Sequence, residues 1–310
     1  MTTGGRLVVG TRGSALALRQ TETVVVGLRR ARPDLDVRVE TIHAAADRLP
    51  EQSLDRFPDI GFFVKELEVA LVEGRIDVAV HSMKDLPAAE SAGLRIAAVP
   101  EREDPRDVLV SRGAAGLLAL PFGARVGTSS PRRAAFLRAA RTDLVVVPIR
   151  GNVETRLRKL DAGEVDAVCL AWAGLRRAGL EPRVTEVLSM DVMLPAPGQG
   201  ALGVQVRDGD AAGELVTVLD HPPTRSAVDA ERAVLRRLQG GCRLPVGASA
   251  VLAGGVLTLT GAVVAPDGSA LLRGRRTGPS TEAAQIGQDL ADDLLAQGAA
   301  TLLPLEGMPR

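Results

Sequence analysis

The chain has 310 residues, 38 basic and 38 acidic side chains, and 2% aromatic residues, so it is long enough for two or three domains and carries no net charge. This balance argues against non-specific nucleic-acid binding, and so few aromatic residues leave no stacking platform for single strands. No apolar run reaches the roughly 18 residues of a membrane span, and no secretory signal pattern opens the chain. We therefore expect a cytoplasmic protein that binds neither nucleic acid nor membrane. Its two cysteines provide neither a disulfide framework nor a metal site.

The first hundred residues alternate between strands and helices. We predict strands at 6–10, 37–42, 77–81 and 94–99, and helices at 15–31 and 63–73. Residues 44–61 have no clean period and contain two prolines, which predicts a mobile loop. Residues 100–107, PEREDPRD, form a charged connector.

The pattern then starts again. We predict strands at 125–127, 144–148, 165–171 and 203–207, helices at 131–141 and 153–162, and a second connector, LPAPGQG, at 194–200. GTRGSALALR at 10–19 parallels GTSSPRRAAFLR at 127–138, and GRIDVAV at 74–80 parallels GEVDAVC at 163–169. This repeat predicts two similar α/β lobes with a cleft between them, and ligands in such folds bind at the carboxyl ends of strands.

The last part of the chain differs from both lobes. We predict helices at 224–239 and 280–297, the second capped by Ser280, and strands at 246–252, 256–264 and 270–277. This pattern indicates a small α+β third domain. The expected domains are 1–100 with 201–220, then 106–195, then 221–310.

An arginine-rich stretch at 125–158 holds eight arginines against two acids. Arg132 and Arg133 fall in the first turn of a helix that Ser130 caps, which is the wrong end for cations unless an anion lies nearby. Guanidinium groups match carboxylates, so this stretch predicts a site for a carboxylate-rich ligand. The alternative is a solvated helix face. Arg150 and Arg156 lie on either side of the next turn, and Arg12 occupies the matching turn of the first lobe. We expect the other arginines of the stretch to be solvated: Arg125, Arg138, Arg141 and Arg158.

Asp85 follows a buried strand in His81-Ser82-Met83-Lys84-Asp85, where it could stabilise a positive charge on a substrate. The alternative is a structural pair with Lys84, and His81 is expected to be a buried strand-end residue. Cys242 follows two glycines and precedes Arg243, whose charge favours the thiolate, so it could be a nucleophile or a covalent attachment point. The alternative is an exposed loop thiol with no role. Cys169 lies in an apolar strand and should be inert.

These motifs together resemble the porphobilinogen deaminase (hydroxymethylbilane synthase) family over nearly the whole chain. The matching stretches are GTRGSALAL (10–18), FVKELEVAL (63–71), DVAVHSMKDLP (77–87), EREDPRD (101–107), VGTSSPRR (126–133), IRGNVETRLRKLDAGEVDA (149–167), LPAPGQGA (194–201) and GGCRLPVGA (240–248). Several distant motifs in the same order make the resemblance specific.

The resemblance implies an α/β fold with two lobes like those of periplasmic binding proteins and a small α+β C-terminal domain. It also implies a dipyrromethane cofactor joined covalently to Cys242, and a monomer that links four porphobilinogens, releases ammonia, and frees hydroxymethylbilane by hydrolysis. Asp85 matches the catalytic acid, which also contacts the cofactor. The expected cofactor-binding residues are Arg12, Ser14, Lys84, Thr128, Ser129, Ser130, Arg132, Arg133, Arg150, Gly200 and Ala201. The expected substrate-binding residues are Arg12, Phe63, Arg150, Arg156 and Arg177.

One region departs from the family. The family's lid loop usually carries Thr-x-Gly-Asp and Gly-Gly-Lys-Gly, whereas this chain has Ala44-Ala45-Ala46-Asp47 and Pro58-Asp59-Ile60-Gly61. We therefore hypothesise intact catalytic residues with altered turnover or product. Two alternatives stay open: a paralogue in a specialised pyrrole pathway, and a two-lobed carboxylate-binding protein without catalysis.

Overall fold

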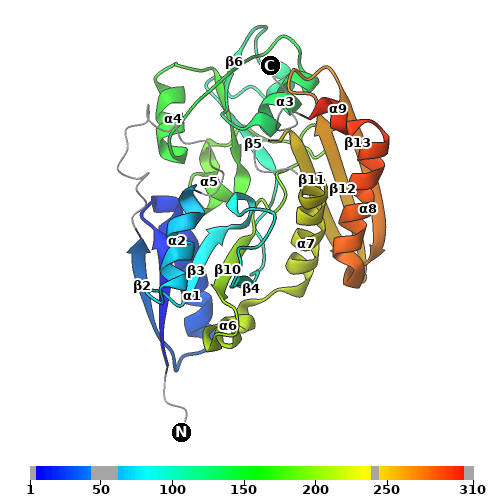
Figure 1. The fold of residues 1–310 in the computed structure, drawn as a ribbon. Coiled ribbons are helices and arrows are strands. Elements are labelled where there is room, and N and C mark those ends of the chain that lie inside the picture. The colour runs from blue at the N-terminus through cyan, green and yellow to red at the C-terminus, as the bar shows by residue number, and fades with distance from the viewer. Residues whose placement is uncertain (1–4, 43–61, 239–243, 304–310) are drawn as a thin grey trace. The chain divides into compact units, whose positions relative to one another are not determined.

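A computed structural model of the chain describes residues 5–42, 62–238 and 244–303, and of Phe62 and Phe63 it describes the backbone only. The chain divides into two compact units (Figure 1). Unit 1 comprises Met1–Glu103 with Ala201–Arg225, and unit 2 comprises Asp104–Gly200 with Ser226–Arg310. The chain first crosses from unit 1 to unit 2 between residues 103 and 104, inside the first predicted connector. It returns to unit 1 between residues 200 and 201, at the end of the second.

Unit 1 is built on a five-stranded sheet in the order β2-β1-β3-β10-β4. Its strands are β1 (Arg6–Arg12), β2 (Asp36–Ile42), β3 (Val78–Ser82), β4 (Leu94–Ala98) and β10 (Leu202–Arg207). Its helices are α1 (Ala15–Ala31), α2 (Phe62–Val72) and α6 (Ala211–Val216), with 3-10 turns η3 (Met83–Asp85) and η6 (Thr217–Leu219). β1 runs parallel to β2 and β3, whereas β10 is antiparallel to β3 and β4. β3 lies between neighbours on both sides, so four of its five residues are buried.

The first sheet of unit 2 repeats this plan in the order β7-β6-β8-β5-β9. Its strands are β5 (Asp107–Ser111), β6 (Arg125–Gly127), β7 (Val145–Val147), β8 (Ala167–Ala171) and β9 (Glu186–Val187). Its helices are α3 (Pro131–Ala140), α4 (Val153–Asp161) and α5 (Trp172–Ala178), with 3-10 turns η4 (Leu117–Ala119) and η5 (Glu181–Arg183). β6 pairs in parallel with β7 and β8, and β5 is antiparallel to β8 and β9. The matching strand orders confirm the internal repeat.

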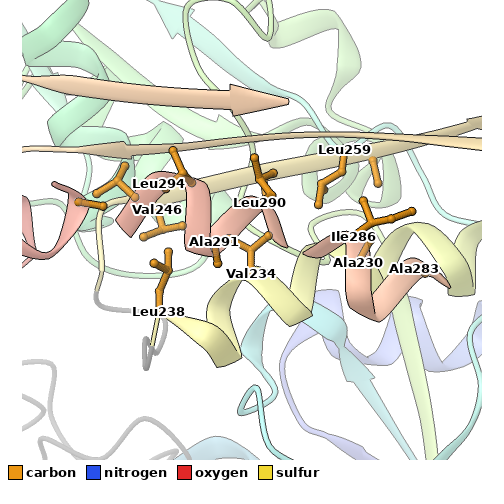
Figure 2. Packing of buried hydrophobic residues seen from close by; sticks show 14 of the residues in the cluster. Ala230, Val234, Leu238, Val246, Leu259, Ala283, Ile286, Leu290, Ala291 and Leu294 are labelled. Carbon is orange, nitrogen blue, oxygen red and sulfur yellow. The ribbon is translucent and has the colours of Figure 1, made fainter. Parts of the chain in front are cut away.

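The C-terminal part of unit 2 is a three-stranded antiparallel sheet covered by helices. The strands are β11 (Val246–Ala253), β12 (Val256–Val264) and β13 (Leu271–Pro279). The helices are α7 (Pro222–Arg237), α8 (Ala283–Ala296) and α9 (Ala299–Leu302), after the 3-10 turn η7 (Ser280–Glu282). Figure 2 shows α7 and α8 side by side against the sheet, with Val234, Leu259 and Leu290 in the core between them. Gly274 lets α8 approach closely, because a Cβ there would lie 2.7 Å from Leu290 Cδ1.

The molecule is thus a mixed α/β protein with two sheet–helix lobes and a small C-terminal sheet-and-helix part, as predicted. Some local predictions were wrong or incomplete. Ser280 begins the turn η7 instead of capping the last helix, which starts at Ala283 with Glu282 at its N-cap. Strand β5 was not predicted, because its first residue, Asp107, had been assigned to the connector. No helix in residues 5–42, 62–238 or 244–303 has the length and apolar character to span a membrane.

Candidate functional site

In unit 1, the predicted site residues gather where two parallel strands end. β1 and β3 are neighbours, with Gly10 opposite Ala79, so Arg12 and the η3 turn lie at the same end of the sheet. Ser14 is the N-cap of α1, and its Oγ accepts a hydrogen bond from Ala17 N at 3.2 Å. Ala201 is brought to this end because its carbonyl accepts from Met83 N at 3.0 Å.

Asp85 closes the η3 turn with its side chain exposed. Among the described residues its carboxylate makes no hydrogen bond and no ion pair, so the structural pair with Lys84 considered from the sequence is absent. An aspartate without a partner, at the carboxyl end of a buried strand, is available to a ligand that carries N–H donors or a positive charge.

In unit 2, Arg132 and Arg133 are almost fully buried and share one acid, Asp107. Arg132 Nη1 lies 2.6 Å from Asp107 Oδ2, and Arg133 Nη2 lies 2.8 Å from Asp107 Oδ1. The exposed fractions of these side chains are 4%, 7% and 0%, which excludes the solvated-face alternative for this pair. Burial alone would raise the pKa of Asp107, but the two guanidinium groups and their hydrogen bonds hold it well below its usual range.

Gln199 joins this buried cluster and fixes the connectors to it. Its Nε2 donates to Asp107 Oδ1 at 3.0 Å and to Pro105 O at 2.7 Å. Arg132 Nη1 also donates to Leu194 O at 2.6 Å. Both connectors are therefore held against the start of α3 on the unit 2 side.

Sequence reasoning had not assigned a role to Asp107 or Gln199. Both lie inside stretches that carried the family resemblance, EREDPRD and LPAPGQG. The excess of arginine at the start of α3 could have indicated that an acid such as Asp107 lies nearby, because buried guanidinium groups need at least one acid close by.

Arg156 is a half-buried cation next to another cation. Its Nε donates to Gly151 O at 2.8 Å, and no described acid pairs with it. Burial, reinforced by the positive charge of Arg133, lowers the pKa of Arg156. Arg132 Nε is buried without a hydrogen-bond partner among the described residues. Among the described residues, Asp107 thus pairs with both Arg132 and Arg133 while no acid pairs with Arg156, an arrangement that fits a ligand bringing carboxylates.

The other predicted contacts of unit 2 lie on adjoining turns. Ser130 caps α3 as expected, with Oγ accepting from Arg133 N at 3.4 Å, and Ser129 Oγ donates to Ile149 O at 2.8 Å. Thr128 Oγ1 accepts from Ser130 N at 3.2 Å. Arg177 Nη2 donates to Gly200 O at 2.7 Å, which links α5 to the end of the second connector. Arg150 ends the segment after β7 and is partly buried.

The prediction that Arg141 is solvated was wrong. Its side chain is 15% exposed, and its guanidinium donates to Leu120 O at 2.7 Å and pairs with Asp143. Arg141 follows α3 directly, so it fixes the segment around η4 to the end of that helix. Arg125 is exposed, whereas Arg138 is partly buried, and each makes polar contacts.

Three predictions fall outside the residues that the structure describes. These are the attachment role of Cys242, the contact made by the Phe63 side chain, and the altered loop at 44–61. Cys169 is buried in β8, and burial raises the pKa of its thiol to about 12, so it is inert core as expected.

Two family models match the chain. The model described as "Porphobilinogen deaminase, dipyromethane cofactor binding domain" matches residues 7–214, and "Porphobilinogen deaminase, C-terminal domain" matches residues 226–296. Curated relatives named porphobilinogen deaminase match along nearly their whole length. That of Desulforudis audaxviator is 50% identical over 96% of both chains, and that of Roseiflexus castenholzii is 49% identical over 96% of this chain and 98% of its own.

The solved structures that align with the chain share little sequence with it. A putative methionine-binding lipoprotein of Bacillus subtilis is 16% identical with a TM-score of 0.42, covering 70% of this chain and 90% of its own. A putative periplasmic sulfonate-binding protein of Methylobacillus flagellatus is 15% identical with a TM-score of 0.39, covering 77% and 69%. At this level of similarity, nothing about ligand or activity follows from them.

Proposed function

The chain belongs to the porphobilinogen deaminase family, and we propose that the polar groups around Asp85 and Arg132 carry out the family's reaction. The enzyme is a transferase of tetrapyrrole biosynthesis that works with a dipyrromethane cofactor. It joins four porphobilinogen units head-to-tail, releases one ammonia per unit, and frees hydroxymethylbilane by hydrolysis. The alternatives left open by the sequence, a specialised paralogue and a non-catalytic binding protein, receive no support from the relatives.

Asp85 acts as the catalytic residue. An exposed carboxylate that pairs with none of the described residues can accept pyrrole N–H hydrogen bonds and stabilise the positive charge left on the substrate when ammonia departs. A fixed group aimed at developing charge is typically worth roughly 3 to 4 kcal/mol of barrier. Arg12, Ser14, Lys84 and Ala201 lie at the same end of the unit 1 sheet or next to it, and we assign them to binding around Asp85.

Arg132, Arg133 and Arg156 bind carboxylates. The dipyrromethane cofactor, when bound, supplies the pyrrole end on which the chain grows, and these side chains would hold its acidic substituents. Asp107 keeps the first two guanidinium groups in place and leaves the cluster short of negative charge. The further binding residues are assigned by family resemblance: Phe63, Thr128, Ser129, Ser130, Arg150, Arg177 and Gly200.

The cofactor needs an anchor, and Cys242 is the proposed attachment point. The proposed domains are 1–100 with 201–220, 106–195, and 221–310, the last carrying Cys242. We assign the enzyme to the cytoplasm, as a monomer with porphobilinogen as its small-molecule partner.

The observation that supports this function best is the group of buried and half-buried arginines around Asp107, combined with an exposed Asp85 that pairs with no residue in the described part of the chain. Intact-mass measurement of the purified protein provides the test. We expect the mass of the chain plus one dipyrromethane, and the loss of that increment in Cys242→Ser. Incubation with porphobilinogen should release ammonia and a linear tetrapyrrole. An unmodified wild-type mass, from cells that make porphobilinogen, would contradict the proposal.

A further inference from the structure

A buried acid, Glu231 of α7, attaches the second connector to the C-terminal part of unit 2. Glu231 is 0% exposed, and its two carboxylate oxygens accept hydrogen bonds from different elements. Oε2 accepts from Gly198 N in the connector at 2.7 Å, and Oε1 accepts from Ala250 N in β11 at 2.9 Å. A buried carboxylate needs such donors, because its oxygens have lost their hydrogen bonds to water. Glu231 therefore joins α7, β11 and the connector at one point.

The local conformation of the connector explains why Gly198 N needs this acceptor. Gln199 N donates to Ala196 O at 2.9 Å, which closes a four-residue turn over residues 196–199. Pro197 and Gly198 occupy its central positions, and the φ of +74° at Gly198 is typical of a type II turn. The turn uses the N–H of Gln199 but not that of Gly198, so the Gly198 N–H is left to bond with Glu231.

β11 holds the beginning of the same connector. Ala248 N donates to Pro195 O at 3.0 Å. A Cβ at Gly247 would lie 2.8 Å from Leu194 O, so glycine lets β11 approach the connector this closely. Leu194 O also accepts from Arg132 Nη1 at 2.6 Å. The connector is thus bonded both to the C-terminal part and to the arginines at the start of α3.

Gln199 transmits the position of Gly198 to these arginines. It follows Gly198 directly and is 1% exposed, and its amide lies between an acid and a cation. Gln199 Nε2 donates to Asp107 Oδ1 at 3.0 Å, and Gln199 Oε1 accepts from Arg133 Nη2 at 3.4 Å. The second distance is near the limit for a hydrogen bond, so a small shift of the connector would break it.

We propose that Glu231 is a positioning residue for the carboxylate-binding arginines, Arg132 and Arg133. Its bond to Gly198 N holds Gln199 in place, and Gln199 in turn fixes the guanidinium groups. Because Glu231 is fully buried, it acts on the affinity for substrate and not on the bond-forming step. This role rests on the proposed carboxylate binding by the two arginines.

The bond to Gly198 can be observed directly, because Pro197-Gly198 is the only Pro-Gly pair in the sequence. In holoenzyme labelled with ¹³C′-proline and ¹⁵N-glycine, an HNCO spectrum therefore shows one signal, that of the Gly198 amide. We expect a downfield proton shift and slow exchange with solvent, since the amide donates to a buried carboxylate. Rapid exchange of this amide in the wild-type protein would overturn the positioning role without any activity measurement.

The effect on substrate is tested with Glu231→Met, which keeps the length of the side chain and removes both acceptors. The KM for porphobilinogen should rise about tenfold, while kcat per dipyrromethane-loaded enzyme stays within about twofold. A purely structural role would instead lower the loaded fraction and leave the KM of the remaining enzyme unchanged, and that result would refute the positioning role.

Glu186→Met is the matched control. Glu186 Oε2 accepts from Leu117 N at 2.6 Å, so this variant breaks another bond between a carboxylate and a backbone N–H of unit 2. Its KM should equal the wild-type value, because this bond does not involve the connector. Equal increases of KM in the two variants would show a general loosening of unit 2 and would count against Glu231.

Glu231→Gln decides the same question if the methionine variant does not fold. It keeps one acceptor, and the Gly198 signal shows whether the connector retains it. The KM should stay near the wild-type value if this signal is unchanged, and it should rise if the signal moves. A wild-type KM with a displaced signal would contradict the positioning role, as would a raised KM with an unchanged signal.

Arg133→Lys separates the positioning role from the function on which it rests. Lysine keeps the charge but loses the planar fork that matches a carboxylate, so the KM should rise. An unchanged KM would count against carboxylate binding by Arg133 itself. A raised KM in Arg133→Lys, combined with a wild-type KM and a displaced Gly198 signal in a Glu231 variant, would count against Glu231 alone.

Discussion

The carboxylate of Asp107 and the guanidinium of Arg132 form a fully desolvated ion pair at 2.6 Å in the interior of unit 2. Asp107 also accepts from Arg133, so one negative charge holds two positive ones. Removing that charge would leave two cations buried without compensation, which is among the most costly changes that a protein interior can undergo.

Asp107→Asn should therefore destabilise the protein by about 3–5 kcal/mol, because it keeps the shape but removes the charge. Chemical denaturation followed by circular dichroism measures this loss. Asp161→Asn is the control, since Asp161 pairs with Arg183 at the surface, where ion pairs contribute about 1 kcal/mol or less. Equal effects of the two substitutions would show that the buried cluster is not needed for stability.

Gly268→Ala should destabilise unit 2. Gly268 has φ +81° in the β12–β13 turn, and a Cβ there would lie 2.6 Å from Ala139 N in α3. Backbone strain and this clash together should cost about 2–4 kcal/mol. Gly254→Ala is the matched control, because Gly254 has φ +57° with nothing within 4 Å of a new Cβ. A thermal shift no larger than that of the control would mean that the contact with α3 is dispensable.

Asp85→Ala should stop ammonia release without affecting folding. The side chain is exposed and makes no polar contact among the described residues, so its loss removes no stabilising bond. A decrease in kcat on the order of 100- to 1000-fold is expected for a group aimed at developing charge. Asp208→Ala, at another exposed aspartate of unit 1, should retain wild-type turnover. Near-normal ammonia release by the Asp85 variant would remove Asp85 from the mechanism.

Arg156→Met should weaken substrate binding but not stability. The substitution removes a cation whose pKa is already lowered by burial and by Arg133, and this offsets the loss of its hydrogen bond to Gly151 O, so the unfolding free energy should change little. The KM for porphobilinogen should increase about 10- to 100-fold, the equivalent of one or two charge-assisted hydrogen bonds. Arg158→Met, two residues further on in α4, should change neither quantity, because Arg158 is exposed and its side chain bonds to Thr155 alone among the described residues.

Stability should also fall as the pH is lowered from about 6.5 to about 4. His81 has a pKa of about 4 in the folded protein and 6.5 as its ordinary value, so in this interval the unfolded chain binds a proton that the folded chain does not. The resulting loss of unfolding free energy is on the order of 3 kcal/mol at pH 4. Urea titrations of wild type and His81→Asn across this range isolate the contribution of His81, because the difference between their unfolding free energies should depend on pH. If the two unfolding free energies changed with pH in parallel, the prediction would be contradicted.

Periodicity in the sequence was enough to predict most elements of the fold. The helix at Ala15–Ala31 and the strand at Val256–Val264 have the predicted limits, because their patterns of apolar residues are long and their ends are marked by turn residues. Strand β5 was missed because it begins inside the charged connector, whose last residue, Asp107, is the first residue of the strand.

Side-chain partners were predicted less well than elements. Asp107 meets Arg132 and Arg133 across 25 or 26 residues of sequence, and nothing in the spacing of the three residues indicates that they share one buried site. Arg141 was expected to be solvated for the same reason, since the carbonyl of Leu120 that receives its hydrogen bond lies 21 residues earlier. Burial and pairing depend on how strands assemble, and local patterns do not report this assembly.

The strand order of unit 1 has a consequence for synthesis of the chain. β10 lies between β3 and β4, yet it is made only after the ribosome has completed all of Asp104–Gly200. Until then the apolar strand β3 lacks its antiparallel neighbour and presents an open edge, the kind of edge that pairs with other chains. The sheet of unit 1 can therefore be completed only late in synthesis, after the first sheet of unit 2 has been made.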